Sequence, residues 1–375
     1  MSGSYCSPSH TNKVTCFKND QLIKIARTIN KRTGQIIEIP SKITESSRKK
    51  LWQDIKTNVH TDSTCREDYC LLNTPDILKS IPLTDLENVF RPVKPLSWVA
   101  NKTQWLSTVD IRQVMKQYER KYTDFKFIGP TPIDFDSKIS ANRCVLDELC
   151  NINLEELIMN NIYRIGVVFN LDPHYKRGSH WVSLFIDCNT GGIYFFDSYG
   201  MKPNTQIQVL MERIKEQGVK LINGRKLNIN NIDDMHTVAR PFKIINDTTI
   251  QVDDSNLFYL KNLLYFGNCT NSSLKLLDNS PCIITKKLKD TLYLDRPITA
   301  NKCNVAIMKS FRTFYNNRRF QYKTTECGVY SIYFIESFLH GNTYDDIIGK
   351  IVNDNEMNKR RDIYYRPNLQ RNVRI

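Results

Sequence analysis

The sequence predicts an α+β fold, because helix-like and strand-like periodicities occupy separate stretches of the chain. Apolar residues recur at helical spacing in three clear stretches, residues 21–31, 44–57 and 107–122. Val182, Leu184 and Ile186 alternate with Ser183 and Phe185, and Gly191-Gly192 separates this stretch from a second apolar run that ends at Asp197. Two such runs joined by a glycine turn predict a pair of antiparallel strands.

Capping residues indicate where the helices begin and end. Ser107 is a good N-cap for the helix of residues 107–122. After Pro203, a helix is expected from about Asn204 to Gly218, because glycine suits the C′ position. The apolar run after Cys327 predicts a further helix that runs to about Leu339.

The chain is long enough for more than one folded region. Its 375 residues allow two or three domains, and 41% hydrophobic and 25% charged residues are ordinary for a folded protein. Prolines at 92 and 95 indicate a linker, so we expect a partly helical accessory region at residues 1–95 and a core at 96–375. Residues of about 224–309 contain short apolar runs separated by polar turns. They predict an inserted, strand-rich subdomain for substrate selection, a lid or partner docking.

The basic charge has two interpretations. A formal net charge of +14 predicts attraction to nucleic acid or another polyanion, or else a solvated basic surface without a partner. Aromatic residues do not interleave with the basic clusters as in RNA-binding motifs. There is no run of about 18 apolar residues and no secretory signal, so we expect no membrane span.

The cysteines do not resemble a disulfide framework. Eleven cysteines, an odd number, occur at irregular spacings, which predicts free thiols in a reducing compartment. Zinc sites prefer tighter Cys-x-x-Cys pairs. We therefore expect free structural cysteines, and no metal, at four positions, Cys65, Cys70, Cys144 and Cys150.

Cys327 stands where a helix would activate a thiol. It precedes Gly328 and the apolar run 329–335, which places it at the first turn of a buried helix. The positive end of a helix dipole favours the thiolate form, and Gln321, six residues upstream, can supply a side-chain donor. The alternative is a buried structural cysteine, since cysteine is among the most buried residue types.

A thiolate nucleophile needs a base and a group that orients the base. His180 begins the first of the two predicted strands, and Asp197 ends the second. Antiparallel pairing would bring both to one end of the sheet, where Asp197 can accept a hydrogen bond from the imidazole. Asp187 is a rival for this role, but it lies at the opposite end of the strand. His174 lies in a loop and is a weaker candidate for the base.

These residues resemble the ubiquitin-like-protein protease superfamily, which includes SUMO proteases, adenovirus proteinase and the polyprotein proteases of poxviruses and African swine fever virus. The family's order of His, Asp, Gln and Cys is matched by His180-Trp181, Asp197, Gln321 and Cys327-Gly328. Residues 325–328 and the Trp105-Leu106-Ser107 element are most similar to the large-DNA-virus branch. The resemblance covers roughly residues 100–222 and 310–365.

The resemblance implies a papain-like, adenain-type cysteine protease core with a central mixed sheet flanked by helices. It implies His180 as base, Asp197 as orienting acid, Gln321 as oxyanion donor and Cys327 as nucleophile, with no cofactor. Trp105 and Trp181 become walls of a narrow substrate cleft, although Trp105 could equally be a core residue.

The implied function is an endopeptidase that cleaves after small residues, as in Gly-Gly-X, and matures viral capsid or core polyproteins. One alternative is a protease that removes SUMO or ubiquitin-like proteins from conjugates. Another is an inactive basic virion protein that binds nucleic acid. Expected partners are a polypeptide substrate and, non-specifically, nucleic acid. The expected location is the host-cell cytoplasm or viral factory, and the virion.

Overall fold

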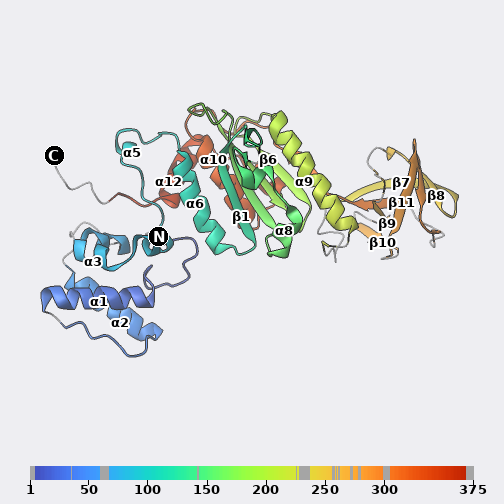
Figure 1. Cartoon of the computed structure of the whole chain (residues 1–375). Helices are drawn as coiled ribbons and strands as arrows, with labels where there is room; N and C mark the ends of the chain where they lie inside the picture. Colours follow the sequence, from blue (N-terminus) through green and yellow to red (C-terminus); the bar gives the residue numbers. More distant parts are fainter. Residues whose placement is uncertain are drawn as a thin grey trace. The chain divides into compact units, whose positions relative to one another are not determined.

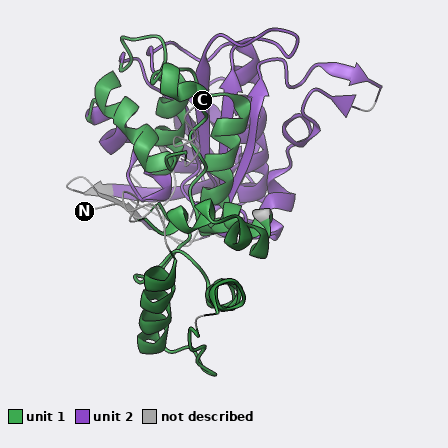
Figure 2. Cartoon of the chain, turned by 90° about the vertical axis from the view of Figure 1, so that its left-hand side faces the viewer, with its two compact units in different colours: residues 1–122, 320–336, 350–375 green, residues 123–319, 337–349 purple. Residues whose placement is uncertain are grey.

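A computed structural model covers the chain and describes residues 5–34, 36–59, 67–141, 143–224, 226–227, 237–255, 258, 260, 262–270, 273–277, 280–298 and 305–368. The chain forms two compact units (Figure 2). Unit 1 contains residues 1–122, 320–336 and 350–375, and unit 2 contains residues 123–319 and 337–349. Among the described residues, no helix is long and apolar enough to cross a bilayer.

The N-terminal part of unit 1 is a small helical assembly (Figure 1, blue). Its elements are α1 (Asn19–Thr33), α2 (Glu45–Asn58), η1 (Asp68–Asn73), α3 (Pro75–Ser80) and α4 (Leu83–Val89). The predicted apolar stripes of α1 and α2 form one buried cluster with Phe17 and Phe90. Thr44 caps α2 through its side chain, and Gly34 ends α1 in the left-handed conformation that glycine permits.

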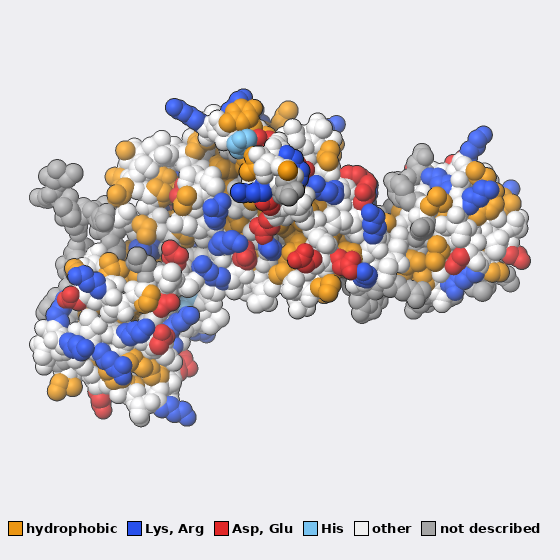
Figure 3. All heavy atoms as spheres, viewed as in Figure 1, with side chains coloured by type: hydrophobic (Ala, Val, Ile, Leu, Met, Phe, Trp, Pro, Cys, Tyr) orange, Lys and Arg blue, Asp and Glu red, His pale blue; other side chains and the backbone are white. Residues whose placement is uncertain are grey.

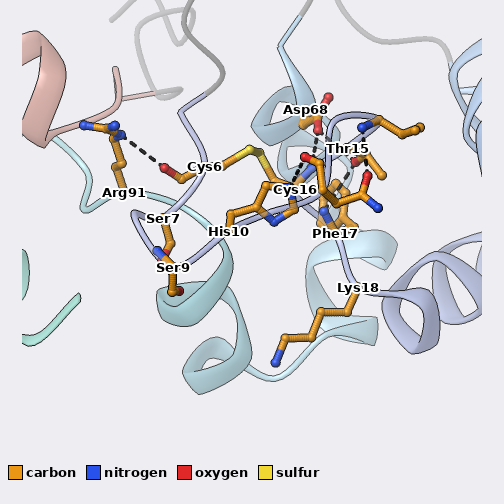
Figure 4. The surroundings of a disulfide bond; sticks show 12 residues. Cys6, Ser7, Ser9, His10, Thr15, Cys16, Phe17, Lys18, Asp68 and Arg91 are labelled. Carbon is orange, nitrogen blue, oxygen red and sulfur yellow. Dashed lines mark hydrogen bonds between the residues drawn. A yellow bond between two sulfur atoms is a disulfide. The ribbon is translucent and has the colours of Figure 1, made fainter. Parts of the chain in front are cut away.

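The expectation of free structural cysteines is wrong for several of them. Disulfides join Cys6 to Cys16 and Cys144 to Cys150, and Cys70 is also disulfide-bonded, whereas Cys65 lies outside the described residues. The N-terminal loop brings the Cα atoms of Cys6 and Cys16 to 5.2 Å, within bonding range, which irregular sequence spacing does not reveal. Figure 4 shows Asp68 beside this disulfide, where its carboxylate accepts hydrogen bonds from the Cys16 amide and the Thr15 hydroxyl.

The rest of unit 1 surrounds the start of the predicted nucleophile helix. It contains α5 (Ser97–Ala100), α6 (Thr108–Lys121), α12 (Asp354–Tyr364) and the first turns of α10 (Cys327–Leu339). Ser107 caps α6 as predicted, and a capping box with Asp110 completes the cap. Asn353 caps α12 in the same way with Glu356.

Unit 2 is built on a five-stranded mixed sheet in the order β1-β4-β5-β6-β14. The strands are β1 (Phe125–Pro132), β4 (Arg164–Asn170), β5 (Trp181–Asp187), β6 (Gly192–Phe196) and β14 (Arg312–Tyr315). The β4–β5 and β5–β6 pairs are antiparallel, while β1–β4 and β6–β14 are parallel. Smaller elements flank the sheet, β2 (Lys138–Ser140), β3 (Arg143–Cys144), α7 (Asp147–Cys150), α8 (Leu154–Met159) and α11 (Tyr344–Gly349).

Helices cover both faces of this sheet, which explains why its central strands are buried throughout. On one face, apolar residues of β4, β5 and β6 form a core with α9 (Thr205–Asn223). On the other face, Phe185 stacks on Phe338 at 4.4 Å, and Tyr194 packs against Phe338 and Tyr344. The prediction of a sheet flanked by helices is confirmed.

Gly218 does not end its helix, contrary to the prediction. It lies inside α9, which continues to Asn223. A Cβ atom at this position would meet the Phe311 ring at 2.5 Å. The glycine is therefore required by the close approach of Phe311, and not by a C-cap conformation.

The strand-rich character predicted for residues 224–309 is confirmed (Figure 1, yellow to orange). The strands are β7 (Thr237–Asn246), β8 (Thr249–Val252), β9 (Leu263–Thr270), β10 (Ser273–Leu276), β11 (Cys282–Leu288), β12 (Thr291–Leu294) and β13 (Val305–Lys309). They pair in the order β10-β9-β11-β12-β8-β7-β13, and β13 also pairs with β9, so that the sheet closes on itself. A separate apolar core fills it.

Candidate active site

Cys327 is the first residue of α10, as predicted, and its side chain is buried. The helix begins as the Tyr330 amide donates to the Glu326 carbonyl at 2.9 Å. Its run of apolar residues is almost entirely buried, which holds the helix start in place. The sulfur therefore lies at the positive end of the α10 dipole.

Gly328 allows the segment before α6 to approach α10 closely. A Cβ atom on Gly328 would lie 3.0 Å from Leu106 Cβ and 3.2 Å from Leu106 Cδ1, tighter than ordinary packing. Leu106 follows Trp105, which is half-buried, and precedes the N-cap Ser107. Leu106 of the Trp-Leu-Ser element thus packs against the first turn of α10.

A buried ion pair anchors Glu326, the residue before Cys327. Arg361 donates from Nε and Nη2 to Glu326 Oε2 at 3.0 and 2.9 Å, and both side chains are almost completely buried. The same guanidinium donates to the carbonyls of Gln104 and Thr325 at 2.8 and 3.3 Å. Asn358 donates to the other oxygen of Glu326. One side chain of α12 therefore positions both the Cys327 loop and the Trp105 segment.

Gln321 is fully buried in the loop before Cys327. Its Nε2 donates to the Lys323 carbonyl at 2.6 Å, and an amide nitrogen carries a second N–H. Asp354 holds the same loop by accepting from the amides of Tyr322 and Lys323 at 2.8 and 2.9 Å. The loop is thus fixed by several hydrogen bonds, which suits a preorganised donor.

The structure brings His180 and Asp197 together as predicted. The distance from His180 Nε2 to Asp197 Oδ1 is 2.7 Å, and the two side chains are only 10% and 3% exposed. A carboxylate accepts, so Nε2 carries the proton in this pair. Tyr199 stacks on the imidazole at 4.5 Å, and Arg319 lies 5.3 Å from the Tyr199 ring.

Asn316, directly after β14, holds the backbone of Asp197. Its Oδ1 accepts from the Asp197 amide at 2.9 Å, and its Nδ2 donates to the Asp197 carbonyl at 2.7 Å. Asn316 is itself buried. Gly200, in the left-handed conformation, lets the chain pass the Arg318 backbone, because a Cβ there would lie 2.7 Å from it.

The loop before His180 is also fixed. Asn170 Oδ1 accepts from the amides of Asp172 and Ser179, and Gly178 leaves room for the Asn170 side chain. Trp181 follows His180 as the first residue of β5 and is buried. These contacts fix the loop that leads into His180.

The two weaker candidates take other places. Asp187 pairs in register with Arg164 at the far end of β5, and burial raises its pKa. His174 forms a second His–Asp pair, with 2.6 Å between its Nδ1 and Asp134 Oδ2, but its side chain is 47% exposed. Sequence reasoning had assigned no partner to His174.

The predicted site residues fall in both units. His180, Asp197 and Trp181 belong to unit 2, whereas Trp105, Gln321 and Cys327 belong to unit 1. Sequence reasoning missed the supporting residues, among them Asn316, Glu326 and Arg361. The sequence did hold a signal for Glu326. It lies directly before a cysteine that was expected to be buried, and a buried carboxylate needs a cation as its partner.

Among known proteins, this chain is similar to proteins named as cysteine proteases of viruses. A protein of Acanthamoeba polyphaga mimivirus named as a thiol protease is 26% identical over 377 residues, which cover 96% of this chain and 93% of that protein. The cysteine protease of African swine fever virus is 25% identical over 183 residues, 45% of this chain and 66% of the viral protein. In another isolate that protein is named a SUMO-1 cysteine protease. A scan against protein-family models finds no match.

The fold agrees with these relatives. A crystal structure of the African swine fever virus protease superposes with a TM-score of 0.55 at 17% identity, over 97% of this chain and 96% of that chain. The resemblance predicted from the sequence and the predicted α+β fold are both confirmed.

Proposed function

Because this chain is a cysteine peptidase homologous to proteases of mimivirus and African swine fever virus, we propose that Cys327 is its nucleophile. His180 is the base, Asp197 orients it, and Gln321 stabilises the oxyanion. The buried His180–Asp197 hydrogen bond of 2.7 Å carries the proposal, because it orients the imidazole and fixes its tautomer. The position of Cys327 at the start of α10 supports the same assignment.

The chemistry proceeds in two steps. His180 Nδ1 takes the proton of the Cys327 thiol, and the thiolate attacks the carbonyl carbon of a scissile peptide bond. Gln321 and the Cys327 amide donate to the oxyanion, and one such donor is typically worth about 10²–10³ in rate. The C–N bond then breaks as His180 protonates the leaving amine, and water activated by His180 hydrolyses the thioester.

We propose a polypeptide substrate that is cleaved after small residues of the Gly-Gly-X type, as in viral polyprotein maturation. Trp105 supports a narrow cleft, because it adjoins the residue that packs on Gly328. Trp181 is the proposed second wall, next to the base. The proposed location is the host-cell cytoplasm or viral factory, and the virion.

A second candidate is removal of a ubiquitin-like protein from conjugates. The naming of one relative as a SUMO-1 cysteine protease favours it. A panel of Gly-Gly-X peptides and a panel of SUMO and ubiquitin fusions separate the two. Cleavage of peptides without fusions supports polyprotein processing, and the reverse supports deconjugation.

The nucleophile is tested with matched cysteine variants. Cys188 is also free and buried, but burial raises the pKa of its thiol far above the usual range, so it should be inert. We expect Cys327→Ala to abolish cleavage, and Cys188→Ala to retain both cleavage and labelling of Cys327 by iodoacetamide at neutral pH. Cleavage by the Cys327→Ala protein would exclude the assignment.

The partnership of Cys327 and His180 has its own test. Dibromoacetone carries two alkylating carbons separated by one carbonyl, so it links a thiol and an imidazole only when they meet. We expect mass spectrometry to find a Cys327–His180 cross-link in the active protein and only single alkylation in His180→Ala. If Cys327 were cross-linked to His174 instead, His174 and not His180 would be assigned as the base.

A further inference from the structure

Unit 1 contains a pocket with a volume of about 620 Å³, a size typical of ligand sites. The end of α4 and the chain after it form one side, and α6 forms another. Leu78 of α3 and Arg366, beyond α12, complete the wall. Of the charged residues that line it, five are basic and one, Glu87, is acidic.

The floor of the pocket is apolar and rigid. Leu72, Leu86 and Phe90 line it and belong to the buried cluster of the N-terminal helices. Gln117 of α6 ties the two walls together by donating to the carbonyls of Glu87 and Phe90 at 3.0 and 2.7 Å. Leu78 is more exposed, at 37%, and offers an accessible apolar contact. An apolar side chain could therefore enter without opening the fold.

Three cations of α6 form one edge of the pocket. Arg112, Lys116 and Arg120 lie four residues apart and so follow one face of the helix. Arg112 and Arg120 are exposed, while Lys116 forms an ion pair with Glu119 at 2.7 Å. Figure 3 shows basic side chains gathered over the region of α6.

Arg366 supplies a cation deeper in the wall. Its guanidinium lies over Tyr69 at 5.5 Å and over Phe90 at 5.9 Å. Its Nε is buried and has no hydrogen-bond partner among the described residues. Burial lowers the pKa of Arg366 to about 10. A partly desolvated guanidinium of this kind would gain from an entering carboxylate.

We propose that this pocket binds an acidic, amphipathic segment of a partner polypeptide, with an apolar side chain on the floor and carboxylates at the rim. Charge complementarity selects an anion, and the apolar floor selects a polypeptide over nucleic acid, whose phosphates would leave that floor unused. The chain's own residues 369–375 contain two arginines and no acidic residue, so their charge does not match the pocket.

The test is selection from a random peptide display library on the full-length Cys327→Ala protein, which binds peptides without cleaving them. We expect the recovered sequences to combine Asp or Glu with Leu, Phe or Met. Synthetic peptides of that kind should bind more weakly as salt rises. Arg112→Glu with Arg120→Glu should weaken binding about tenfold or more, because two attractions become two repulsions. Leu78→Ala should weaken it less.

The matched control is Lys24→Glu with Arg27→Glu on α1, which changes the charge equally at exposed helical positions away from the pocket lining. It should leave binding unchanged. Arg366→Met, which keeps an apolar side chain against Tyr69 and Phe90, should weaken binding because the cation is lost. Recovered peptides without acidic residues, an equal loss in the control, or tighter binding of single-stranded DNA at the same residues would overturn the proposal.

Discussion

The Glu326–Arg361 pair gives the sharpest test of how the loop before Cys327 is held. Arg361→Met keeps most of the side-chain volume and removes the cation. Glu326 is 1% exposed, so its carboxylate would remain buried without its cation. Removing one partner of a buried ion pair costs about 3–5 kcal/mol. Two carbonyls, of Gln104 and Thr325, lose their donor as well, so we expect the upper half of that range.

The assay is unfolding in urea, monitored by tryptophan fluorescence. Arg361→Met should lower the unfolding free energy by about 4 kcal/mol, a large fraction of a typical total of about 5–15 kcal/mol. Adding Glu326→Gln should restore most of the loss, because the buried charge is then gone. The control is Lys50→Met, whose partner Glu38 is 82% exposed and whose loss should cost less than about 1 kcal/mol.

The same variant should lower kcat/KM, because Arg361 positions both the residue before Cys327 and the residue before Trp105. The reasoning would be refuted by a loss below about 1 kcal/mol in Arg361→Met, or by a double variant no more stable than the single one. Either result would mean that the carboxylate reaches water or another cation once Arg361 is removed.

Three further predictions follow from single contacts. Gly218→Ala should destabilise unit 2 by about 1–3 kcal/mol in thermal unfolding, and Phe311→Leu should recover part of it, because the new methyl group meets the Phe311 ring. Asn316→Ala should lower kcat, and with it kcat/KM, far more than it changes KM, because the Asp197 backbone loses both of its hydrogen bonds to the Asn316 side chain. An unchanged kcat would contradict this. Burial lowers the pKa of His10, so its neutral form is favoured on folding. Stability should therefore fall as pH drops below about 6.5, and His10→Gln should show a smaller fall in urea midpoints between pH 7.5 and 5.

Local signals explain why four catalytic candidates could be predicted from the sequence. The glycine turn and the alternating pattern set the register of β5 and β6, and that register carries His180 to Asp197. Cys327 was placed at a helix start because a polar loop precedes a long apolar run. Each signal lies within about twenty residues, which is the range over which periodicity is informative.

The supporting contacts could not be predicted, because their partners are distant in sequence. Asn316 and Asp197 are separated by 119 residues, and Glu326 and Arg361 by 35. No regular sequence spacing connects the two residues of either pair, so neither contact can be predicted from the sequence. Gly218 shows the same limit, because its sequence position suits a helix end while its role is to admit Phe311. The disulfides were missed for a different reason: their cysteines are only 10 and 6 residues apart, but irregular spacing does not show that the folded loops bring the sulfur atoms together.

The sequence by itself determined the helix that begins at Cys327, the strand pair that joins His180 to Asp197, and the resemblance to viral cysteine proteases. Those features depend on periodicity and on the order of a few chemically distinctive residues. Only the tertiary structure decided which charges are buried together, which cysteines are joined, and where five basic residues surround an apolar floor. Burial and pairing depend on long-range packing, and packing is a property of the folded chain rather than of any one segment.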